Sequence, residues 1–242
     1  MTILLRTAPD DRERRRGCLD RIGLRDRPVH PRRHGLAGHQ VPERTGNERV
    51  GRPADPNGGR ASAPETCAQA EKVFTDSNRR ILEHAAKNPD DWGMGCTADL
   101  LAFTDGRYVI GHVGDSRVYL LRNTGLSQLT RDHSWVQLQV DQGVLTPPEA
   151  RIHPRKNIIL RAVGTDVSVS PDILEGEALD HDIFLLCSDG LTDMVEDSLI
   201  QRILSSAAPL HQKADGLIEA ALAAGGSDNV TVVLCQVEMS NH

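Results

Sequence analysis

Apolar residues recur at helical spacing from Thr66 onward, and charged residues fill the opposite positions. This stripe predicts a helix over about 66–88. Asn88-Pro89 ends it, because the residue before a proline avoids the helical region of backbone space. The apolar positions of the stripe are Ala70, Phe74, Ile81, Leu82 and Ala85.

Short apolar runs after this helix predict strands. Residues 108–113 and 117–121 are two such runs, and Gly114-Asp115-Ser116 lies between them. The composition of these three residues is typical of a turn, so the pattern predicts a hairpin. A further strand is expected at 127–130 after the turn residues Asn123-Thr124-Gly125.

The rest of the chain mixes helices and strands. Amphipathic helices are predicted over about 194–206 and 209–224, between strands at 182–187 and 230–235. Residues 132–165 show no regular pattern and contain three prolines and two glycines, so we expect a mobile surface excursion with a short helix. Strands that cluster, rather than alternating strictly with helices, indicate an α+β fold with antiparallel sheets.

Residues 1–64 lack such a pattern beyond the short apolar run Ile3-Leu4-Leu5. They contain no Phe, Trp or Tyr, and they carry seven of the chain's 13 prolines. A segment of this composition buries too little apolar area to offset the entropy of ordering. We therefore predict that residues 1–64 are mostly disordered and that one globular domain spans 65–239.

The charge, hydropathy and cysteine content of the chain argue against nucleic-acid binding by the globular part, a membrane span and a disulfide framework. Residues 1–64 hold 14 arginines against eight acidic residues, whereas the whole chain has a net charge of −6. The globular part is thus acidic and would repel nucleic acid; an Arg-rich arm that binds RNA or an acidic partner is the alternative. No apolar run approaches the ~20 residues of a membrane-spanning helix. Five scattered cysteines without a CxxC pair favour a reducing cytoplasm over a disulfide framework.

Three aspartates share one context, since each stands beside a small residue at the end of an apolar strand. They are Asp115, Asp189 and Asp228. Carboxylates on rigid strand ends can converge on Mg²⁺ or Mn²⁺, which favour oxygen ligands. Two such ions ~3.5–4 Å apart can share a hydroxide and stabilise an in-line displacement at phosphorus. Asp and Gly are also ordinary turn residues, so spacing alone does not join the three.

Five motifs in a fixed order carry a family resemblance that runs from about Val73 to Val237. Together they closely resemble the metal-dependent protein serine/threonine phosphatases of the type 2C (PPM) family, bacterial branch. The motifs are GMGCTADLLAF (93–103), GHVGDSRVYLLR (111–122), LTRDHSWV (129–136), LLCSDGLTDMV (185–195) and GGSDNVTVVL (225–234).

The resemblance implies a two-layer antiparallel β-sandwich flanked by α-helices, and hydrolysis of phosphoserine and phosphothreonine by a metal-bound hydroxide. By resemblance, Asp189 and Asp228 match catalytic ligands of a dinuclear Mn²⁺ or Mg²⁺ centre, and Asp115 matches a ligand of a further, weaker metal. Residues 132–165 match a flap beside the active site, in which Asp132-His133 is a candidate positioning pair. The expected partners are phosphorylated Ser/Thr proteins, within the pathway of a Ser/Thr kinase.

Two family motifs that precede the helix are not readable in residues 1–64. One is an Arg that holds substrate phosphate, and the other is an Asp-Gly stretch that bridges both metals. Arg32-Arg33-His34-Gly35 can be encoded by nucleotides that give Asp-Gly-Met one base later. We hypothesise that residues from roughly 7 to 64 are a frameshifted translation, which would impair catalysis. The alternative is a non-catalytic, phosphatase-like binding module in kinase signalling.

Overall fold

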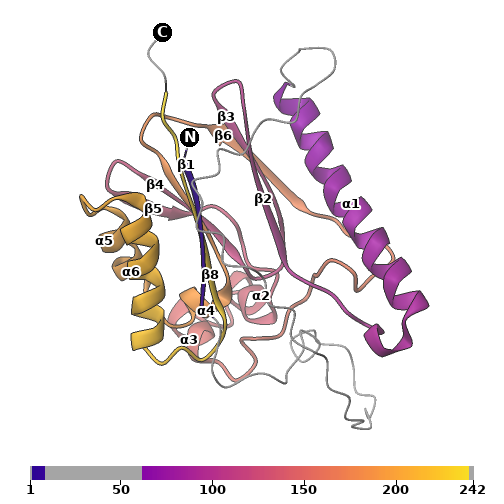
Figure 1. Cartoon of the computed structure of the whole chain (residues 1–242). Helices are drawn as coiled ribbons and strands as arrows, with labels where there is room; N and C mark the ends of the chain where they lie inside the picture. The colour runs from indigo at the N-terminus through magenta and orange to yellow at the C-terminus, as the bar shows by residue number, and fades with distance from the viewer. Residues whose placement is uncertain (1, 9–61, 240–242) are drawn as a thin grey trace.

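Two antiparallel sheets pack face to face, with helices on both outer sides (Figure 1). The computed structural model describes residues 2–8, by their backbone, and residues 62–239. The α+β class and the two-layer antiparallel sandwich predicted from the sequence are thus confirmed. In spatial order, the larger sheet is β1 (Thr2–Ala8), β8 (Val230–Gln236), β7 (Ile183–Cys187), β4 (Arg117–Arg122) and β5 (Gly125–Gln128). The smaller sheet is β2 (Ala98–Thr104), β3 (Arg107–Val113) and β6 (Asp172–Glu177).

The core between the sheets centres on Phe184 of β7, which is fully buried. The rings of Phe103 and Tyr108 from the smaller sheet meet it edge-on, with centroids 5.4 and 5.0 Å away. Edge-to-face pairs of this kind stabilise a core beyond the area that they bury. The continuous apolar run that predicted β7 therefore reflects a strand that is covered on both faces.

Helices cover the outer face of each sheet. α1 (Ala63–Lys87) packs on the smaller sheet, where Phe74 lies so close to Gly111 of β3 that a Cβ there would be 2.4 Å from the ring. α5 (Asp197–Leu204) and α6 (Leu210–Ala223) cover the larger sheet, with Leu204 and Leu217 in its core. α1 begins at Ala63, before the position expected from its stripe, because Glu65 accepts a hydrogen bond from the N–H of Ser62.

The predicted hairpin around Gly114-Asp115-Ser116 is wrong. β3 pairs with β2 and β6, whereas β4 pairs with β5 and β7, so these three residues cross from one sheet to the other. Gly114 has a φ of +124°, and a Cβ there would be 2.3 Å from the side chain of Thr97. A turn-like composition therefore marks a tight crossover here rather than a hairpin.

Strand β1 lies within the segment predicted to be mostly disordered. Its residues pair with β8 in antiparallel register from Thr2↔Gln236 to Ala8↔Val230. The sequence contains only a three-residue apolar run at this point, and the pairing partner lies more than 200 residues away in the chain. Residues 9–61, and with them most of that prediction and of the frameshift hypothesis, lie outside the described residues.

The predicted excursion at 132–165 contains two short helices rather than one. They are α2 (Trp135–Asp141) and α3 (Pro147–Ile152). Shorter elements complete the fold: η2 (Pro89–Asp91), a single 3₁₀ turn, follows α1, and α4 (Asp189–Thr192) follows β7. No helix in the described part of the chain is long and apolar enough to cross a membrane.

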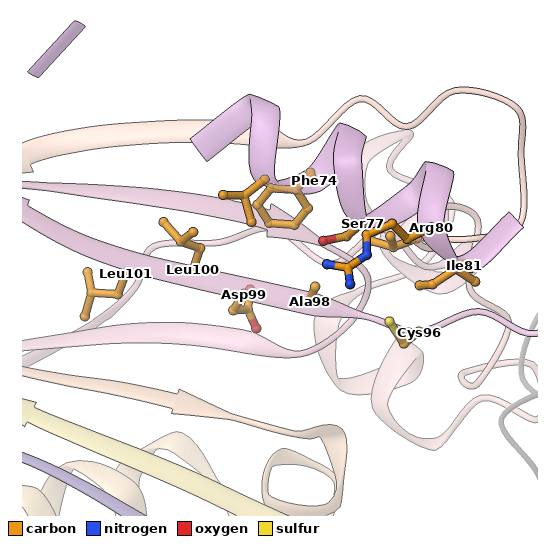
Figure 2. A pocket seen from close by; sticks show the side chains of 11 residues that line it. Phe74, Ser77, Arg80, Ile81, Cys96, Ala98, Asp99, Leu100 and Leu101 are labelled. Carbon is orange, nitrogen blue, oxygen red and sulfur yellow. The ribbon is translucent and has the colours of Figure 1, made fainter. Parts of the chain in front are cut away.

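The outer edge of β2 borders a groove of about 650 Å³ between this strand and α1 (Figure 2). Among the described residues, β2 has a strand partner on one side only, and all seven of its residues are half-buried. Both faces of the strand contribute to the groove, since it is lined by Ala98, Asp99, Leu100 and Leu101, together with Phe74, Arg80 and Ile81 of α1.

Candidate active site at one end of the larger sheet

The three aspartates singled out from the sequence lie at the same end of the larger sheet. β4 and β8 begin at this end and β7 finishes there, because the three adjacent strands are antiparallel, with Arg117 opposite Cys187 and Cys187 opposite Val232. Asp115 and Asp228 each precede a strand by two residues, and Asp189 follows β7 by two. All three side chains are half-buried.

The turns that carry Asp189 and Asp228 are locked together by Ser188. Its hydroxyl donates to the carbonyl oxygen of Asn229 at 3.1 Å and accepts from the N–H of Thr231 at 3.1 Å. Its own N–H donates to the carbonyl oxygen of Thr231, also at 3.1 Å. The carboxylate of Asp228 accepts from the N–H of Asn229 at 2.7 Å. The three hydrogen bonds of Ser188 to the backbone of residues 229 and 231 therefore hold the two aspartate-bearing turns against each other.

The side-chain oxygen atoms at this end of the sheet are of the type that binds a divalent cation, but among the described residues there are too few of them close together to form a site. Carboxylate oxygens are the ligands that Mg²⁺ and Mn²⁺ prefer, and the hydroxyl oxygen of Ser116, beside Asp115, is buried without a hydrogen-bond partner among the described residues. However, no group of three or more His, Cys, Asp or Glu side chains within the described part of the chain could hold a metal ion. These residues therefore do not form a complete metal site by themselves.

The segment 132–165 is fastened beside this end of the sheet by ion pairs. The ammonium of Lys156 is 2.8 Å from the carboxylate of Asp193, which directly follows α4, and Arg151 is 2.9 Å from Glu196. These side chains are partly exposed, so each pair contributes at most ~1 kcal/mol. These two ion pairs therefore contribute little to holding this segment against α4.

A stronger pair anchors the beginning of that segment. Arg117, the first residue of β4, donates two parallel hydrogen bonds to the carboxylate of Asp132, at 2.8 and 2.7 Å. Burial disfavours the charge of Arg117, but the hydrogen bonds and charge of Asp132 outweigh it and raise the guanidinium's pKa. The guanidinium also donates to the hydroxyl of Tyr119 at 3.2 Å. Asp132, a candidate positioning residue, is therefore held by a bidentate charge pair.

Sequence reasoning gave no role to His112, Asp99 or Asp172. His112 is fully buried in β3 and lies 2.7 Å from Asp99, and Asp172 at the start of β6 lies 3.1 Å from His133. The available signal was a single histidine inside the apolar run 108–113, because a buried polar group requires partners.

Comparisons with known proteins agree with this architecture. The model of the protein phosphatase 2C family matches residues 51–139. The chain is 41% identical over 169 residues to the serine/threonine phosphatase stp of Listeria monocytogenes serovar 1/2a, covering 70% of this chain and 67% of that protein. The chain belongs to the protein phosphatase 2C family. The resemblance inferred from the five motifs is thereby confirmed.

Other members of the protein phosphatase 2C family show the same relationship. The serine/threonine protein phosphatase PstP of Mycobacterium tuberculosis is 42% identical over 170 residues, which cover 70% of this chain and 33% of PstP. The crystal structure of Stp1 from Staphylococcus aureus matches 75% of this chain and 71% of that chain, with a TM-score of 0.71 and 35% identity. The catalytic domain of PstP in complex with two manganese ions matches 74% of each chain, with a TM-score of 0.68 and 38% identity.

Proposed function

We propose that this phosphatase 2C chain hydrolyses phosphoserine and phosphothreonine in proteins. Asp115, Asp189 and Asp228 are proposed as Mn²⁺ or Mg²⁺ ligands, and Asp189 and Asp228 as the catalytic pair. The location of these three aspartates at the same end of the larger sheet carries the proposal, and the phosphatase names of the relatives support it. A divalent ion, when bound, would activate water and neutralise phosphate charge.

The chain's own residues define the surroundings of the reaction. Burial strongly raises the pKa of the Cys187 thiol, which therefore stays protonated and does not act as a nucleophile. The segment 132–165 borders the site through Lys156 and Arg151, and its partly exposed ion pairs allow it to adapt to a protein substrate. We place the substrates in a cytoplasmic pathway of a Ser/Thr kinase.

One observation favours a second candidate function. The described residues contain no group of three or more side chains that could hold a metal ion, and the family's Asp-Gly bridging motif cannot be read in residues 1–64. A chain without that ligand would retain the fold and the surface of a phosphatase without turnover. It would then act as a binding module for phosphoproteins.

A single comparison separates the two candidates. The purified chain is assayed for hydrolysis of a phosphothreonine peptide with and without Mn²⁺, beside Asp189→Ala and the control Asp90→Ala, which lies on the exposed turn η2. The catalytic proposal requires turnover that needs Mn²⁺, disappears in Asp189→Ala and persists in Asp90→Ala. Folded protein that binds the peptide but releases no phosphate establishes the binding module instead.

A further inference from the structure

Two buried histidines lie against each other next to the crossover that carries Asp115. The ring centroids of His112 and His133 are 4.7 Å apart, with planes tilted by 37°. His112 belongs to β3, and His133 belongs to the start of the segment 132–165. Both residues are buried, so every polar contact of their rings has to be made within the protein.

The hydrogen bonds of His112 require a doubly protonated ring. Its Nδ1 lies 2.7 Å from the carboxylate of Asp99, and its Nε2 lies 3.1 Å from the carbonyl oxygen of Arg131. A carboxylate and a carbonyl only accept hydrogen bonds, so both ring nitrogens donate. Burial lowers the pKa of His112, but the bonds to Asp99 and Arg131 outweigh burial and raise it overall.

The hydrogen bonds of His133 require the opposite state. Its Nδ1 accepts the N–H of Gly114 at 3.0 Å, so this nitrogen carries no proton. Its Nε2 therefore carries the ring's single proton, which it donates to the carboxylate of Asp172 at 3.1 Å. Burial, together with the charges of His112 and Arg161, lowers the pKa of His133 against the opposing effect of Asp172. The pair is thus a cation packed against a neutral ring.

His133 connects three segments through its backbone as well as its ring. Its N–H donates to the carbonyl oxygen of Gly114 at 2.7 Å, so Gly114 and His133 exchange two hydrogen bonds. The carbonyl oxygen of His133 accepts the N–H of Leu160 at 2.7 Å. His133, near the start of the segment 132–165, therefore joins the residue immediately before Asp115 to Leu160 in the later part of the same segment.

We propose that His133 is a positioning residue: its neutral ring fixes the crossover at Gly114, and with it the place of Asp115, two residues before the start of β4. This inference rests on the proposed phosphatase function. A neutral imidazole suits this position because it accepts from Gly114 at one nitrogen and donates to Asp172 at the other. Burial, together with the positive charge of His112 behind the ring, disfavours a second proton on that ring.

Three variants test the proposal. His133→Asn keeps an acceptor close to the place of Nδ1, whereas His133→Ala removes both ring contacts. Asp172→Ala leaves the histidine in place but removes the acceptor of its Nε2 proton, at a side chain that is 41% exposed. Circular dichroism and thermal unfolding establish which variants fold. If His133→Ala does not fold, Asp172→Ala is used in its place.

The first readout does not depend on activity. Amide hydrogen exchange of Gly114 should become at least about tenfold faster in His133→Ala, should stay close to wild type in His133→Asn, and should not change in α6 in either variant. Asp172→Ala should accelerate the same peptide to a smaller extent. Unchanged exchange at Gly114 in the folded Ala variant overturns the proposal, whether or not the chain is a phosphatase.

The second readout separates positioning from general destabilisation. With a small aryl phosphate as substrate, His133→Ala should lower kcat about tenfold or more while KM changes less than about threefold, and His133→Asn should restore most of kcat. Faster exchange with an unchanged kcat also overturns the proposal. Absence of turnover in the wild-type chain rejects the proposed function instead, and the exchange measurement then decides on His133 alone.

Discussion

The backbone of Asn229 lies directly against Gly190. A Cβ at position 190 would stand 2.3 Å from the carbonyl oxygen of Asn229 and 2.9 Å from its carbonyl carbon. Gly190 follows Asp189, and Asn229 follows Asp228, so this contact sets how closely the two candidate catalytic carboxylates approach. Only a residue without a side chain allows the approach.

Gly190→Ala should therefore push the two turns apart. Because the opposing atoms are backbone and cannot rotate away, we expect a loss of ~1–3 kcal/mol in the free energy of unfolding. Mn²⁺-dependent hydrolysis of a phosphothreonine peptide should fall much further than this loss explains. Urea unfolding and initial rates on the same preparation measure the two effects.

The matched control is Gly216→Ala in α6. A Cβ there would lie 3.6 Å from the side chain of Ile203, which is an ordinary contact. Alanine favours the helix interior by ~0.5–1 kcal/mol over glycine, so this variant should be as stable as the parent or more stable. If both variants behave alike, the contact between Gly190 and Asn229 does not determine the site.

Arg117→Met should destabilise the chain strongly. The side chain of Asp132 is only 11% exposed, and the substitution leaves its charge without its partner. Removing one member of a buried ion pair costs ~3–5 kcal/mol, which urea unfolding detects directly. Arg107→Met is the control, since Arg107 lies 3.5 Å from Glu175 with side chains 38% and 48% exposed. Its loss should stay below ~1 kcal/mol, and equal losses in the two variants would contradict this account.

The stability of the chain should depend on His133 at acidic pH. Its pKa is lowered from the ordinary value of 6.5, chiefly by burial, so the unfolded chain takes up this proton more readily than the folded one. The stabilising contribution is present above pH 6.5 and is lost as the pH falls below it. His133→Asn carries no such proton, so its unfolding free energy, measured by urea titration from about pH 8 to 5, should fall less steeply than that of the wild type.

His112 should act in the opposite direction. Its pKa is raised above 6.5 because the bonds to Asp99 and Arg131 outweigh burial, so the folded chain binds this proton more tightly. The contribution is complete below pH 6.5 and is lost as the pH rises through the raised value. His112→Gln should remove this loss from the same titration. Identical pH slopes in the His112 and His133 variants would exclude the assigned protonation states.

The hydrogen bonds of Asn78 in α1 to the segment after residue 160 should contribute to the stability of the chain. Its side-chain oxygen accepts the N–H of Gly164 at 2.6 Å, and its nitrogen donates to the carbonyl oxygen of Asp166 at 2.9 Å. Asn78→Leu leaves the buried N–H of Gly164 unpaired, which costs ~1–3 kcal/mol. The control is Thr75→Ala, at an exposed position of the same helix, which should change the midpoint of thermal unfolding little. If the midpoint falls equally in both variants, the hydrogen bonds of Asn78 do not stabilise this contact.

Helices and strands whose own residues show a clear apolar pattern could be predicted from the sequence. α1 follows from its stripe, and β7 and β8 follow from continuous apolar runs. Periodicity does not identify the partner of a strand, however, and β4 pairs with β7, more than 60 residues later in the chain. For this reason the turn-like composition around Gly114 predicts a hairpin where the structure has a crossover.

The candidate site, like the fold, could be predicted from the sequence only in part. Asp115, Asp189 and Asp228 stand out as strand-end aspartates, and their common location follows only from the antiparallel order of β4, β7 and β8. The histidine pair could not be derived, because Asp99 and Asp172 belong to β2 and β6, which were not predicted. Among the described strands β6 is a sheet edge, and its sequence DILEGE is charged and lacks the apolar pattern of a covered strand.

The side of β2 that has no strand partner among the described residues has a consequence for handling the protein. Its sequence ADLLAFT contains neither lysine nor proline, the residues that usually keep an open strand from joining another chain, whereas the opposite edge, β6, carries Glu175 and Glu177. We therefore expect copies in a concentrated stock to extend the smaller sheet through this strand. Light scattering should therefore rise with protein concentration and storage time at an unchanged pH, and dilute, freshly prepared samples are the ones in which kinetics and exchange report on the single molecule.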